Sequence, residues 1–84
     1  MNKDLLLDQA ATDANFTRSR LTYCEMKVMN DTPVVAVCVD DMPSTFRWDL
    51  DFDAQIESYT EQQINEGVLD DFVADMSAYL IGYE

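Results

Sequence analysis

Carboxylates are the functional groups that this sequence offers in greatest number, and they gather in its C-terminal half. The 84 residues include 17 Asp and Glu against 5 Lys and Arg, a formal net charge of −12. Residues 48–84 hold ten of the acids and none of the cations. Carboxylates at this density can bind a metal ion, transfer protons in an active site or pair with the cations of a partner protein. The candidates are Asp49, Asp51, Asp53, Glu57, Glu61, Asp70, Asp71 and Asp75.

The remaining residue types argue against catalysis. The chain has no histidine, so an imidazole base, a histidine ligand and a histidine-dependent triad are all excluded. We expect Cys24 and Cys38 to be buried, without a neighbouring cation to lower their pKa values. Two glycines, Gly67 and Gly82, are too few for a phosphate-binding loop. Since solvated carboxylates also lack the desolvation that tunes an acid–base pair, we expect a binding protein that is not an enzyme and needs no cofactor.

A calcium site is the metal-binding alternative. The segment from Asp49 to Ile56 places aspartates at the first, third and fifth positions of an EF-hand-like loop. It departs from that loop at Ala54, where the loop needs glycine, and at Thr60, where it needs a bidentate glutamate. We therefore expect no metal site, and calcium binding stays a third alternative.

Length and composition indicate one packed domain over residues 1–84. An apolar fraction of 48% is too high for an acidic disordered tail. No apolar run approaches the ~18 residues of a membrane span, and Leu5-Leu6-Leu7 is too short for the core of a signal peptide. We expect a cytoplasmic protein with no membrane contact. The strong negative charge also argues against direct binding to nucleic acid, whose phosphates are negative.

The N-terminal half is expected to form a helix and two strands. Asn2 can cap a helix over residues 3–15, whose apolar side includes Leu6 and Leu7. Residues 21–29 alternate as in a half-buried strand, and turn-forming residues follow. Residues 33–39 are apolar on both faces, as in a central strand.

The hairpin brings the two cysteines together in one possible register. If Val28 lies opposite Val34, Cys24 lies directly across from Cys38, at a Cβ separation of ~4.5–5.5 Å. Two small core residues with free thiols are the expected outcome, because cytoplasmic proteins rarely hold disulfides. A cross-strand disulfide remains the alternative.

The C-terminal half is expected to hold a third strand and one or two helices. After a connection over residues 40–45, the segment Phe46–Asp53 alternates between apolar residues and charged residues, which predicts a strand with an acidic face. Asp53 then caps a helix to about Asn65, and apolar residues recur at helical spacing over 68–80. Whether Gly67 separates two helices is left open. The predicted fold class is α+β: a three-stranded antiparallel β-meander flanked by an N-terminal helix and one or two C-terminal helices.

On these expected elements the acids stand at regular intervals. The strand 46–53 separates its aspartates by ~6.7 Å. On the expected helices, the two acids of a pair lie one turn apart, or ~6 Å along the axis. The pairs are Glu57 with Glu61 and Asp71 with Asp75. Phosphates along one nucleic-acid strand are roughly 6–7 Å apart along the backbone, for a rise of 3.4 Å per nucleotide. A basic groove in a partner would turn the repulsion among these acids into attraction.

In size, acidity and α+β layout, the chain resembles small phage-encoded nucleic-acid mimics: uracil-DNA glycosylase inhibitors, anti-restriction proteins and anti-CRISPR proteins. Glu57-Ser58-Tyr59 is similar to the Glu-Ser-Ile element with which glycosylase inhibitors engage the DNA-binding cleft. In that family the element lies on an edge strand beside an apolar pocket, whereas residues 57–59 fall in a segment that we expect to be helical. The resemblance implies stoichiometric occlusion of a nucleic-acid-binding cleft inside a bacterial host cell.

The leading hypothesis is therefore an acidic DNA-mimic inhibitor whose eight candidate acids contact a basic nucleic-acid-binding protein or enzyme. The alternative is an antitoxin, immunity or adaptor-type module that complements a basic partner surface without imitating nucleic acid. The identity of the target and any self-association into a homo-oligomer are left open.

Overall fold

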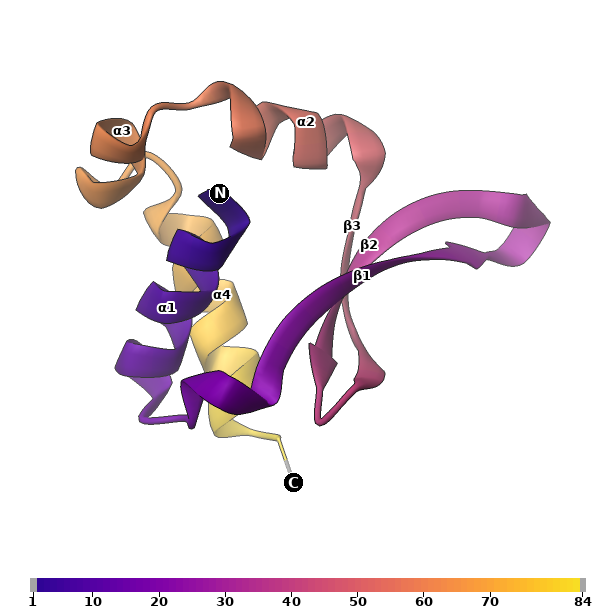
Figure 1. The fold of residues 1–84 in the computed structure, drawn as a ribbon, viewed down its shortest axis with the longest axis horizontal. Helices are drawn as coiled ribbons and strands as arrows, with labels where there is room; N and C mark the ends of the chain where they lie inside the picture. Colours follow the sequence, from indigo (N-terminus) through magenta and orange to yellow (C-terminus); the bar gives the residue numbers. More distant parts are fainter. Residues whose placement is uncertain (1, 84) are drawn as a thin grey trace.

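The expected α+β architecture is present in residues 2–83, which the computed structural model describes (Figure 1). A helix comes first, three antiparallel strands follow, and the remaining helices return to pack on the first. The elements are α1 Asn2–Ala14, η1 Arg18–Arg20, β1 Leu21–Val28, η2 Met29–Asp31, β2 Thr32–Val39, β3 Met42–Asp49, α2 Leu50–Ser58, α3 Glu61–Asn65 and α4 Asp70–Ile81.

Both connections in the sheet are tight and use residues that tolerate left-handed backbone. Asn30 and Asp31 have positive φ between β1 and β2, and Asp40 and Asp41 have positive φ between β2 and β3. Asn and Asp adopt this conformation more readily than other side-chain-bearing residues. The expected connection over residues 40–45 is therefore wrong, because β3 begins at Met42 and includes Pro43. Proline is tolerated there because β3 is an edge strand of the order β1-β2-β3.

The register of the hairpin differs from the one that would place the cysteines opposite each other. Cys24 pairs with Ala36, and Thr22 pairs with Cys38, so the register is shifted by two residues. A shift of two preserves the face of every side chain. Cys24 and Cys38 are thus diagonal neighbours on one face of the sheet, and both are free thiols.

The core lies between the helices and one face of the sheet. Val35, Val37 and Val39 of β2 share it with the buried side chains of α1 and α4. Helices α1 and α4 lie side by side and run in the same direction (Figure 1). The fully buried Ala10 of α1 leaves room for close helix packing. Trp48 of β3 is also buried.

Asn2 has a different role from the predicted helix cap. It lies within α1, and its side-chain amide donates hydrogen bonds of 2.7 Å to the carbonyl oxygens of Ile56 and Tyr59. These two carbonyls belong to the end of α2, where the helix leaves backbone acceptors without partners. Asn2 therefore ties α1 to α2.

The third strand ends four residues earlier than the alternation predicts. Asp49 caps α2, and its Oδ1 accepts a 2.7 Å hydrogen bond from the backbone N–H of Phe52. Asp51 and Asp53 then occupy the first turn, where the helix dipole favours negative charge. These helix-start preferences outweigh the period-two pattern beyond Asp49. The predicted cap at Asp53 is wrong, and Leu50, expected on a buried strand face, is exposed.

The segment after Asp53 contains three helical pieces within the described residues. Helix α2 ends at Ser58, and α3 starts after Thr60, whose side chain forms a capping box with Gln63. The predicted single helix from Asp53 to about Asn65 is therefore wrong, because it is divided between α2 and α3. Gly67, with φ of 96°, separates α3 from α4, which answers the question that the sequence left open. None of the helices in residues 2–83 combines the length and the apolar character that a bilayer crossing requires.

Candidate protein-binding surface

Two of the eight candidate acids share a single lysine in a partly buried cluster. The Lys3 Nζ lies 3.1 Å from the Asp53 Oδ1 and 3.2 Å from the Glu57 Oε2. Asp53 also accepts a 3.1 Å hydrogen bond from the indole N–H of Trp48. Burial alone would lower the pKa of Lys3, but the hydrogen bonds and charges of the two acids outweigh it and hold the pKa above its usual value. Asp53 and Glu57 therefore join α1 to α2, and their ion pairs with Lys3 make them less accessible to a partner than the exposed acids.

The other six candidate acids are exposed, and none of them forms an ion pair with a cation among residues 2–83. They lie at the starts of three helices and in the second turn of α4. The set is Asp49, Asp51, Glu61, Asp70, Asp71 and Asp75.

The regular spacing expected for the acids survives only in α4. Asp51 and Asp53 lie on a helix, so the strand ladder with Asp49 is absent. Glu57 and Glu61 belong to two different helices, because Tyr59 and Thr60 separate α2 from α3. Asp71 and Asp75 do share α4, where positions four apart are ~6 Å apart along the axis.

A hollow of about 390 Å³ adjoins these acids of α4. Phe52 of α2 lines it together with Phe72, whose ring centroid lies 5.0 Å away from that of Phe52. Asp70, Asp71 and Asp75 line the same hollow. An apolar, aromatic surface beside three carboxylates suits a side chain with an apolar stem and a cationic end, such as arginine or lysine.

A second hollow, of about 380 Å³, adjoins the first on the α1 side. Asp70 lines both hollows, and Asp8 and Asp13 of α1 line the second. Asp8 is paired with Arg18, whereas Asp13 is exposed. We call Asp13, Asp70, Asp71 and Asp75 the α4 acidic surface.

The sequence interpretation missed Asp13 as a member of this surface. The helical periodicity of polar and apolar residues places Asp13 on the outer side of α1, but it does not show which helix packs beside α1. Only the packing of α1 alongside α4 brings Asp13 near Asp70.

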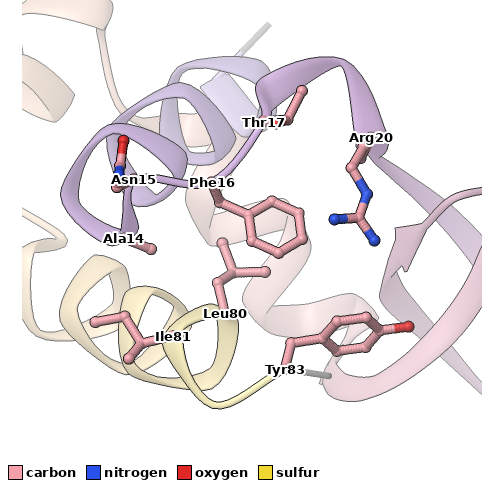
Figure 2. A pocket seen from close by; sticks show the side chains of 8 residues that line it. All are labelled: Ala14, Asn15, Phe16, Thr17, Arg20, Leu80, Ile81 and Tyr83. Carbon is pink, nitrogen blue, oxygen red and sulfur yellow. The ribbon is translucent and has the colours of Figure 1, made fainter.

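A third hollow, of about 340 Å³, lies at the C-terminal ends of α1 and α4 (Figure 2). Phe16, Leu80 and Tyr83 line it, and the guanidinium of Arg20 lies 4.8 Å from the centroid of the Phe16 ring. Arg20 also forms a two-pronged ion pair with Asp40, whose pKa it lowers mainly through these hydrogen bonds. None of the candidate acids lines this hollow, so it lies outside the α4 acidic surface.

The segments proposed for calcium and for glycosylase-inhibitor binding have other roles. Asp49 caps a helix and Asp51 and Asp53 form its first turn, so no EF-hand-like loop exists there. No group of three or more metal-ligating side chains is assembled among residues 2–83. Glu57 and Ser58 end α2, and Tyr59 is its C-cap, so this element does not lie on an edge strand.

Comparison of the chain with protein-family models, with curated proteins and with solved structures finds no match.

Proposed function

We propose that this protein is an acidic inhibitor that occupies the nucleic-acid-binding cleft of a basic partner through the α4 acidic surface. The supporting observation is that Asp70, Asp71 and Asp75 are exposed beside an apolar hollow. None of these three acids has a cation partner among residues 2–83. The partner is a protein with lysines or arginines in a groove that normally holds phosphates. Inhibition is stoichiometric and involves neither catalysis nor a cofactor.

Local helix stability accounts for only part of this charge. Asp70 and Asp71 lie in the first turn of α4, where negative charge interacts favourably with the helix dipole. Asp75 lies beyond that turn, and it repels Asp71 by a few tenths of a kcal/mol. The Asp71–Asp75 pair therefore has a cost in the free protein that a cationic partner removes.

The geometry of α4 supports imitation of a phosphate backbone over a short distance. Asp71 and Asp75 present two charges ~6 Å apart on a rigid helix, close to the spacing of successive phosphates. The hollow at Phe52 and Phe72 adds apolar contact that nucleic-acid phosphates do not provide. We therefore expect affinity to fall with added salt, but less steeply than the affinity of the same partner for DNA.

The second candidate function is an adaptor or antitoxin-type module that binds a basic surface outside any nucleic-acid cleft. It is favoured by the loss of the strand ladder, since among the exposed candidate acids only Asp71 and Asp75 remain at phosphate spacing on a single element. The two candidates differ in whether nucleic acid competes for the same partner surface.

The test begins with capture of partners on the immobilised protein from a bacterial lysate at low and high salt. A captured nucleic-acid-binding protein is then titrated with a DNA or RNA duplex. The proposed inhibitor is displaced by the duplex, and excess inhibitor abolishes duplex binding. Unchanged duplex affinity in the presence of saturating inhibitor contradicts nucleic-acid mimicry and supports the adaptor function.

A matched pair of variants locates the binding surface. Asp71→Asn with Asp75→Asn removes two charges from α4, and we expect affinity to fall at least tenfold. Glu25→Gln with Asp31→Asn removes the same charge from exposed positions of the β1–β2 hairpin, and we expect less than a threefold change. Equal losses in the two variants would show that net charge alone drives binding and would refute the assignment of this surface.

A further inference from the structure

The two cysteines form a close pair on the sheet, away from the α4 acidic surface. The sulfur atoms of Cys24 and Cys38 are 2.7 Å apart, although the residues are diagonal neighbours in the ladder. Diagonal side chains across antiparallel strands are normally within reach only when they are long. The ladder between β2 and β3 shifts register between Ala36 and Cys38, and such a bulge increases local twist. The sheet thus holds two thiols in contact.

The two thiols differ in their access to solvent. Cys38 is only 4% exposed, whereas Cys24 on the edge strand β1 is half-buried. A reagent from solution therefore reaches the Cys24 sulfur first. Cys38 lies behind it, in position to attack the Cys24 sulfur once that sulfur is bonded to another.

We propose that Cys24 and Cys38 form a reversible dithiol–disulfide pair that is oxidised by low-molecular-weight disulfides of the glutathione type. The Cys24 thiolate attacks one sulfur of the oxidant, and one glutathione thiolate leaves. The Cys38 sulfur then attacks the Cys24 sulfur, and the second glutathione thiolate leaves. The two protein thiols lose two protons and two electrons in total, the departing glutathione thiolates take up both, and the products are one intramolecular disulfide and two glutathione thiols.

The electrostatics of the pair favour this order of attack. Burial, followed by the hydrogen bond with Cys24, raises the pKa of Cys38 to about 11. Cys38 therefore keeps its proton at neutral pH and is the poorer first nucleophile. Once Cys24 is bonded to glutathione, the closeness of the two sulfurs makes the second step intramolecular.

The bond would join β1 to β2 across residues that are 14 positions apart in the sequence. Closing a loop of this size restricts the unfolded chain, and we expect the melting temperature to rise by roughly 10 °C or more. Because Cys24 and Cys38 do not line the hollows beside α4, the expected effect is on stability and not on partner binding.

The experiment equilibrates the full chain in buffers with increasing ratios of oxidised to reduced glutathione. Remaining thiols are then blocked with N-ethylmaleimide, and intact masses are measured. The expected species at a high ratio has lost two hydrogens, carries no blocking group and no glutathione, and is monomeric. The expected product of Cys38→Ser is a glutathione adduct at Cys24, whereas Cys24→Ser leaves the buried thiol largely free of glutathione.

Three results overturn the proposal. In the first, the wild-type protein takes up two blocking groups at every glutathione ratio. In the second, it accumulates glutathione adducts in place of the internal disulfide, and in the third it forms disulfide-linked dimers. A thermal melt of the wild type provides a second readout that needs no variant. Equal melting temperatures for the oxidised and reduced forms would refute the expected restraint between β1 and β2.

Discussion

Replacing Lys3 by methionine removes the cation that pairs with both Asp53 and Glu57, while most of the apolar stem of the side chain is retained. Within residues 2–83, neither acid forms an ion pair with another cation. The side chains of Lys3, Asp53 and Glu57 are 11%, 19% and 29% exposed. The two ion pairs are therefore intermediate between fully buried pairs and pairs exposed at the surface. Removing one partner of a buried pair costs about 3–5 kcal/mol, and exposed pairs contribute about 0.2–1 kcal/mol. We expect Lys3→Met to lower the free energy of unfolding by ~2 kcal/mol.

This cost should be visible in both chemical and thermal unfolding. For a domain of this size, ~2 kcal/mol corresponds to a fall in melting temperature of roughly 10 °C. Urea titrations followed by Trp48 fluorescence measure the effect directly, since the indole N–H donates to Asp53. The matched control is Lys27→Met, an exposed cation of β1 that forms no ion pair within residues 2–83, with an expected change under ~0.5 kcal/mol.

A thermodynamic cycle separates the ion pairs from the packing of the lysine stem. In a background with Asp53→Asn and Glu57→Gln, the acids no longer need a cation, and Lys3→Met should cost less than half of its effect in the wild type. The reasoning is refuted if Lys3→Met is no more harmful than Lys27→Met. It is also refuted if the cost of Lys3→Met is the same in both backgrounds.

Three further predictions concern local features of the fold. The pKa of Lys3 is higher in the folded protein than its usual value of 10.5, so the charged lysine contributes its full stabilisation below pH 10.5. That stabilisation is lost as the pH rises through the folded-state pKa, so the stability difference between wild type and Lys3→Met should shrink only at strongly alkaline pH. Asp49→Ala should cost ~1 kcal/mol in urea unfolding because α2 loses its cap, and Asp49→Ser should retain most of that stability. Gly67→Ala should cost ~1–2 kcal/mol, because φ is 96° there and a Cβ would lie 2.6 Å from Asp70 Oδ2; an unchanged unfolding midpoint would contradict this account.

The distribution of the five cations limits where a basic partner can bind. Lys3 is paired with acids of α2, Arg18 with Asp4 and Asp8, and Arg20 with Asp40. None of these ion pairs involves a residue of the α4 acidic surface. Lys27 and Arg47 form no ion pair within residues 2–83. Among the described residues no cation therefore forms an ion pair with the α4 acidic surface, although Arg18 reduces the charge beside it at Asp8.

Short-range patterns in the sequence were sufficient to predict the order of elements. Alternation predicted the first strand of the hairpin, and an apolar run predicted the second. The apolar repeat after Gly67 predicted α4, in which Val73, Met76 and Leu80 are buried. These patterns succeed because the side-chain periods of helix and strand determine which residues face a core. The boundary at Asp49 could not be read from alternation, because an aspartate that caps a helix also fits the polar position of an alternating strand.

The excess of acid over base in the C-terminal half was likewise determined by the sequence alone. The sequence did not determine which acids are available, because availability depends on contacts between residues far apart in the chain. Lys3 reaches Asp53 and Glu57 across 50 and 54 positions of the chain and pairs with both. The packing of α1 alongside α4 places Asp13 and Asp70 around one hollow. Periodicity describes each element by itself, whereas these contacts depend on how the elements pack, and only the tertiary structure contains that information.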